Sequence, residues 1–97
     1  MSDAASHVLI LHEVDDYPAW KAVFDAAADL RRAAGELSFQ VLRHDDAANH
    51  IVHFSRWRSL EDARTFFESA DLVEIRRRAG VRAPVFLYLD QLAQGYL

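Results

Sequence analysis

The order of strand-like and helix-like segments constrains the fold of this chain most. Four short segments are rich in branched and aromatic residues, which predicts strands: 7–14 (HVLILHEV), 36–44 (ELSFQVLRH), 50–57 (HIVHFSRW) and 83–92 (APVFLYLDQL). Residues 17–34 and 59–79 carry apolar side chains at helical spacing, which predicts two helices. The predicted order is therefore β-α-β-β-α-β.

Local signals support the ends of the two predicted helices. Pro18 suits a first helical turn, where its missing N–H is not needed, and Gly35 suits the C-terminal cap of the first helix. Ser59 with Asp62 resembles a capping box at the start of the second helix. Ser69 offers a further cap, so we expect the second helix to break or bend there.

Short connections and right-handed crossovers leave few arrangements for this order, and the ferredoxin-like α+β sandwich is the commonest. We expect an antiparallel sheet in the spatial order 4-1-3-2, with both helices on one face. Pro84 predicts an edge position for the fourth strand. A length of 97 residues indicates a single domain, 1–97, in which 1–6 is a flexible N-terminus and 91–97 a C-terminal tail.

The face of this sheet away from the helices needs a cover. We assign six apolar side chains to that face, and burial of so much apolar surface favours a second copy of the chain. They are Val8, Ile10, Val14, Ile51, Trp57 and Phe86. The predicted assembly is a homodimer, with a tetramer as a further alternative, in which residues 91–97 contact the partner. Ile10→Asp or Ile51→Asp is expected to break the dimer.

Composition excludes several classes of function. A net charge of −4 argues against nucleic acid as the partner, and the absence of cysteine excludes disulfides and thiolate chemistry. Because apolar runs are short and residues 1–6 lack a basic region, we expect no membrane span or secretion signal, and a cytoplasmic protein. The sequence contains no Gly-rich phosphate loop, and we expect no cofactor.

Three parts of the sequence carry a family resemblance: 12–24, 54–63 and 75–81. In them the chain resembles the dimeric α/β-barrel superfamily, in particular its antibiotic-biosynthesis-monooxygenase-like branch. The resemblance implies a homodimer whose sheets face each other, and a pocket between each sheet and its helices or within the barrel. It also implies one of several chemistries: cofactor-independent quinone formation, polyketide cyclisation, lactone isomerisation or haem degradation. Haem degradation fits least, because that branch uses a histidine of the second helix and 59–79 contains none.

His12 and His53 are the candidate catalytic residues. Antiparallel pairing of their strands brings them together on one sheet face, and a histidine is a natural proton acceptor from a phenol. We expect Gln40 and Tyr88 to bind ligand on the same face by orienting an oxygen, and Trp57 to line the pocket. The alternative is that these polar residues only satisfy hydrogen bonds inside a partly wet barrel.

We expect no metal site. His50 and His53 point to opposite faces of one strand, so they cannot share an ion, and a set of His12, His53 and Asp90 is a weak alternative. The predicted function is a cofactor-independent monooxygenase or cyclase acting on an aromatic or polyketide-like small molecule. The alternative is a non-catalytic dimeric module for ligand binding or stress response. An apolar cavity with convergent histidine and tyrosine side chains would favour the enzyme or the ligand-binding module over a purely structural role.

Overall fold

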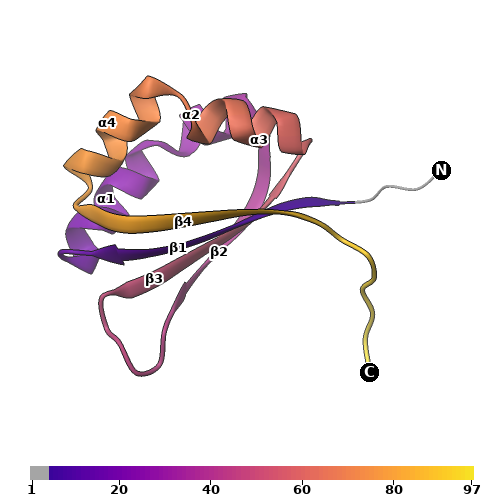
Figure 1. The fold of residues 1–97 in the computed structure, drawn as a ribbon, viewed down its shortest axis with the longest axis horizontal. Helices are drawn as coiled ribbons and strands as arrows, with labels where there is room; N and C mark the ends of the chain where they lie inside the picture. The colour runs from indigo at the N-terminus through magenta and orange to yellow at the C-terminus, as the bar shows by residue number, and fades with distance from the viewer. Residues whose placement is uncertain (1–4) are drawn as a thin grey trace.

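A computed structural model of the chain describes residues 5–97 (Figure 1). The strands are β1 (Ser6–Val14), β2 (Glu36–Arg43), β3 (His50–Trp57) and β4 (Val81–Asp90), and the helices are α1 (Tyr17–Ala26), α2 (Ala28–Ala34), α3 (Leu60–Phe67) and α4 (Ala70–Arg78). Residues 1–4 of the expected flexible N-terminus lie outside the described residues, and Ser6 already belongs to β1.

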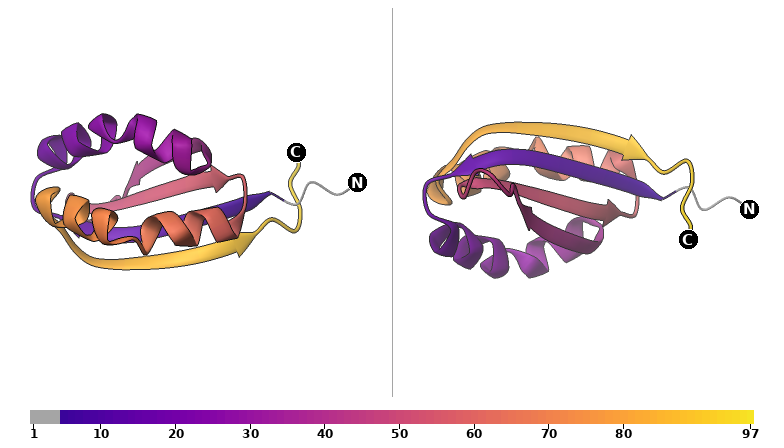
Figure 2. Two further views of the ribbon diagram at one scale, coloured as in Figure 1. Left: turned by 90° about the horizontal axis from the view of Figure 1, so that it is seen from above. Right: turned by 90° about the horizontal axis from the view of Figure 1, so that it is seen from below.

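The sheet is antiparallel with the order β2-β3-β1-β4, which confirms the ferredoxin-like α+β fold and the predicted strand order. All helices lie on one face of the sheet, as Figures 1 and 2 show. β4 is an edge strand, which accommodates Pro84 without losing a ladder hydrogen bond in the sheet centre.

Each predicted helix is divided into two. Ser69 caps α4 by accepting a hydrogen bond from the Leu72 amide at 3.4 Å, so the expected bend of the second helix is confirmed. The division of the first helix at Ala27 (φ −92°, ψ 7°) was not predicted, because an alanine carries no signal for a helix end. Gly35, at φ 124°, then turns the chain from α2 into β2 and so places Glu36 at the start of the strand.

The assignment of apolar side chains to the open sheet face was wrong. Val8, Ile10, Val14, Ile51 and Trp57 are buried beneath the helices, and Phe86 packs against the same core. The strands β1 and β4 are apolar on both faces, so alternation alone does not tell which face the helices cover. Ile10→Asp or Ile51→Asp would therefore disrupt the core of the subunit itself.

The face of the sheet away from the helices is also apolar, because the strands carry a second set of apolar side chains at the alternate positions. The pairing of strands places them in rows such as Leu42, Val52, Leu11 and Val85 across all four strands. We call the whole set the outer face, and it consists of Leu9, Leu11, Leu42, Val52, Phe54, Val85, Leu87 and Leu89. Several of its side chains are two-fifths or more exposed, among them Leu11 and Leu87 at 40%.

The C-terminal segment after β4 has no regular structure and extends away from the sheet in Figure 1. Its side chains Leu92 and Tyr96 are almost fully exposed, at 97% and 99%. Among the described residues, none of the helices has the length and apolar character that crossing a membrane requires.

Candidate functional site

A cavity of about 80 Å³ lies between the helices and the sheet. Its wall is mainly apolar and aromatic, and only four basic side chains interrupt it. The aromatic residues are Trp20, Phe24, Phe66, Phe67 and Phe86, and the basic residues are His12, Arg31, His53 and Arg76. Such a wall suits a flat aromatic molecule with few polar groups.

His12 comes from β1 and is 7% exposed. Within residues 5–97 neither ring nitrogen, Nδ1 nor Nε2, has a hydrogen-bond partner. Burial, together with the proximity of His53, lowers the pKa of His12 from 6.5 to about 4, so the ring is neutral at neutral pH. The ring packs against Trp20, with 5.3 Å between the centroids. A buried imidazole without a partner is costly, and a ligand with a polar group in the cavity would satisfy it.

His53 comes from β3 and is 3% exposed. It pairs with Ile10, whereas His12 pairs with Ile51, so the two histidines are diagonal neighbours on the same sheet face. The Nε2 atom of His53 lies 2.9 Å from Oε2 of Glu36. The rings of His53 and Phe24 meet in a T-shaped arrangement, with 4.9 Å between the centroids and 88° between the planes.

The Glu36 side chain that contacts His53 belongs to a buried ion pair. Nε of Arg31 donates to Oε1 of Glu36 at 2.6 Å, and both side chains are at least nine-tenths buried. The guanidinium also donates to the Phe24 carbonyl oxygen and lies 3.6 Å from the centroid of the Phe24 ring. Burial alone would raise the pKa of Glu36, but the hydrogen bonds from His53 and Arg31, together with the positive charge of Arg31, outweigh it and hold that pKa below its usual value.

The structure brings together only part of the predicted site. His12 and His53 meet at the cavity, as the strand pairing predicts. Gln40 does not join them, because Val41 pairs with His53 and Gln40 therefore points to the opposite face of the sheet. Trp57 is a core residue, packed on Phe66 and Phe67 with its Nε1 bonded to Ser55, and does not line the cavity.

Tyr88 shares the helix-covered face but lies beyond the cavity wall. It pairs with Val8, and Arg64 lies over its ring at 4.6 Å. Burial raises the pKa of its hydroxyl. Tyr88 is therefore a neighbour of the site and does not contact the cavity space.

Arg31 and Glu36 were not among the predicted site residues. A signal for Arg31 was present, since it continues the helical spacing of Trp20, Phe24 and Ala27, all of which line the cavity. Leu30, the apolar neighbour of Arg31 in α2, is 46% exposed, and Arg31 lines the cavity in its place. Glu36 carried no comparable signal, because an acid at the start of a strand is usually solvated.

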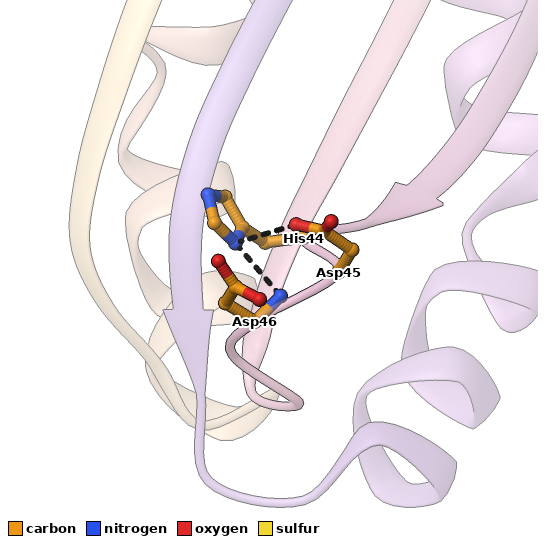
Figure 3. Close-up of side chains that lie close together, drawn as sticks. All are labelled: His44, Asp45 and Asp46. Atoms are coloured by element: carbon orange, nitrogen blue, oxygen red, sulfur yellow. Dashed lines mark hydrogen bonds and ion pairs between the residues drawn. The ribbon is translucent and has the colours of Figure 1, made fainter.

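A cluster of His44, Asp45 and Asp46 gathers three potential metal ligands in the loop after β2 (Figure 3). The Asp46 amide donates to Nδ1 of His44 at 3.2 Å, and all three side chains are exposed. The cluster is thus explained as a hydrogen-bonded turn.

The fold and the cavity define a ferredoxin-like domain with an aromatic chamber between its sheet and its helices. Residues 10–78 match the sequence model of the antibiotic biosynthesis monooxygenase family, and the chain belongs to this family. No curated protein matches the chain.

Solved structures of the same fold come from several bacteria. A candidate antibiotic biosynthesis monooxygenase from Bordetella bronchiseptica is 16% identical, with a TM-score of 0.76 over 94% of this chain and 100% of that chain. SnoaB, a cofactor-independent oxygenase from Streptomyces nogalater, is 18% identical, with a TM-score of 0.71 over 96% and 97%. A monooxygenase from the gene ActVA-Orf6 of Streptomyces coelicolor, in complex with nanaomycin D, is 15% identical, with a TM-score of 0.66 over 97% and 93%.

Proposed function

We propose that the chain is a cofactor-independent monooxygenase acting on a small aromatic, polyketide-like molecule held in the cavity. The observation that carries this proposal is His12, whose two ring nitrogens are buried without a partner in the wall of an apolar cavity. The similar fold of SnoaB, a cofactor-independent oxygenase, and of the ActVA-Orf6 monooxygenase bound to nanaomycin D supports it.

The wall suits a ligand that is flat and bears a hydroxyl. Trp20 and Phe24 stack with 4.9 Å between their centroids, and Phe67 packs on Phe86 at 5.6 Å, so aromatic rings line the cavity from α1, α3 and β4. An aromatic ligand gains from stacking there, and its hydroxyl would meet the two histidines.

The chemistry requires a base and a dry chamber. A histidine removes a proton from the ligand, and the resulting carbanion or phenolate transfers electrons to dioxygen. In the net reaction a ring CH2 group and O2 become a ring carbonyl group and water, so the ligand itself supplies all the electrons. The apolar wall excludes bulk water from the reactive anion. A cyclase would use the same base to form a carbon–carbon bond without consuming oxygen.

We also propose that the chain works as a homodimer through its outer face. Eight apolar side chains in adjacent rows form one contiguous apolar patch, and such patches commonly mark interaction surfaces. Two-fold symmetry presents the same patch twice, so one surface covers both copies. The exposed tail 91–97, with Leu92 and Tyr96, extends beyond β4 and is proposed to pack on the partner.

Oxidation of 1,8-dihydroxyanthrone tests the enzymatic proposal. Oxygen uptake and quinone absorbance are measured together, after subtraction of spontaneous oxidation. We expect wild-type protein to accelerate both, and the double variant His12→Phe/His53→Phe to lose the acceleration. His50→Phe is the matched control, because His50 is exposed and outside the cavity. Binding of the anthrone without oxygen uptake would favour the non-catalytic ligand-binding module, and absence of binding would refute both.

A further inference from the structure

The two histidines of the cavity differ in their hydrogen-bond partners. His53 has a buried carboxylate partner, with 2.9 Å between its Nε2 and Oε2 of Glu36. His12 has no partner on either nitrogen among the described residues. The cavity wall therefore carries one imidazole with a carboxylate partner and one imidazole without a partner.

The carboxylate partner determines the tautomer of His53. Glu36 is ionised, because the hydrogen bond from His53 and the guanidinium of Arg31, 2.6 Å from its other oxygen, outweigh the effect of burial and hold the pKa of Glu36 below its usual value. An ionised carboxylate only accepts hydrogen bonds, so Nε2 of His53 carries the proton. The other nitrogen, Nδ1, is then left unprotonated and free to accept one.

The charges around the two rings also differ. Glu36 of β2 is hydrogen-bonded to His53, and Arg31 of α2 is paired with Glu36. His12 of β1 is the neighbour of His53, and Arg76 of α4 lines the same cavity. A proton placed on His53 creates a cation in contact with a carboxylate. A proton placed on His12 creates a cation in an apolar wall with no counter-ion, which burial disfavours.

We infer that His53, and not His12, is the base that takes the proton of the ligand, and that Glu36, held by Arg31, is its positioning residue. This inference rests on the proposed function. In the step, the O–H bond of the ligand breaks, its proton forms a bond with Nδ1 of His53, and the electron pair stays on the ligand oxygen. His12 remains neutral and donates or accepts a hydrogen bond to the same ligand, which makes it an orienting group.

The tautomer is testable without any ligand. In protein with 15N-labelled histidine, we expect Nδ1 of His53 to give the shift of an unprotonated nitrogen, with roughly a tenfold excess of the Nε2–H tautomer. In Glu36→Gln the excess is expected to fall severalfold, because an amide both donates and accepts. Glu13→Gln is the matched control: Glu13 lies 3.1 Å from Nε2 of exposed His50, and only the His50 signals should change.

If Glu36→Gln does not fold, the double variant Arg31→Met/Glu36→Gln removes both buried charges and gives the same comparison. A His53 tautomer that is protonated at Nδ1 in wild-type protein, or that is unchanged when Glu36 is replaced, overturns the inference. Because this measurement needs neither ligand nor turnover, it stands apart from the proposed function.

Proton transfer is measured with 4-nitrophenol, whose phenolate absorbs visible light. At a pH where the free probe is almost wholly protonated, we expect wild-type protein to raise the phenolate absorbance. His53→Gln and Glu36→Gln should lower this signal severalfold, whereas His12→Gln should weaken binding of the probe but keep the phenolate fraction of the bound form. Loss of the phenolate in His12→Gln with its retention in His53→Gln would reverse the assignment. Failure of the probe to bind at all would count against the proposed function, and the tautomer would still decide the inference.

Discussion

Acid should destabilise the fold by protonating His12, and replacement of His12 should remove this part of the pH dependence. The pKa of His12 falls from 6.5 to about 4 on folding, because burial and the neighbouring His53 disfavour the charged ring. The unfolded chain then binds the proton more tightly than the folded chain. The contribution of His12 to stability is therefore fully present above pH 6.5 and is lost as the pH falls toward 4. Between about pH 7 and about pH 4.5, this single group should remove about 2 kcal/mol from the free energy of unfolding.

The variant His12→Phe isolates this contribution. Phenylalanine keeps the contact with Trp20 and removes two buried nitrogens without partners, so at neutral pH the variant should be at least as stable as wild type. The difference between the two proteins should widen by about 2 kcal/mol on acidification, as urea unfolding across the pH range would show. His44→Gln is the control, since its exposed ring is hydrated in both states. Wild type and His12→Phe unfolding with parallel pH dependence would refute the reasoning.

Three further outcomes are expected. Leu87→Asp on the outer face should convert the dimer to a folded monomer in sedimentation, whereas Ile51→Asp, in the core, should lower helix content in circular dichroism. Glu36→Gln should cost about 3–5 kcal/mol in urea unfolding because it leaves Arg31 buried without a counter-ion, and adding Arg31→Met should recover most of that loss. Removal of residues 92–97, which keeps the hydrogen bond from the Gln91 amide to the Ala5 carbonyl oxygen, should weaken dimerisation at least tenfold without lowering subunit stability; an unchanged dissociation constant would refute the role of the tail.

The succession of strands and helices along the chain was enough to predict the strand order, but the alternation of apolar residues did not show which face of the sheet the helices cover. The segment from His7 to Val14 is apolar at odd and at even positions, so both faces of β1 are suited to burial. Only the position of the helices distinguishes Val8 and Ile10, which they cover, from Leu9 and Leu11, which they do not.

The same ambiguity explains the mixed result at the site. His12 and His53 share a face with buried residues of their own strands, and strand pairing then fixes them as neighbours. Gln40 was grouped with them as a polar residue, although its neighbours in β2, Phe39 and Val41, are the residues that share the helix-covered face with His53. The ion pair behind His53 depends on the turn at Gly35, which no pattern of apolar residues describes.

Binding of an aromatic hydroxyl in the cavity is tested most directly by a crystal structure of the protein with 1-naphthol. We predict the naphthol ring between Trp20 and Phe67, with its oxygen within hydrogen-bond distance, about 3.2 Å or less, of a ring nitrogen of His12 or His53. A structure in which side chains fill the cavity, or in which naphthol binds only at the outer face, would contradict the assignment of this cavity as the functional site.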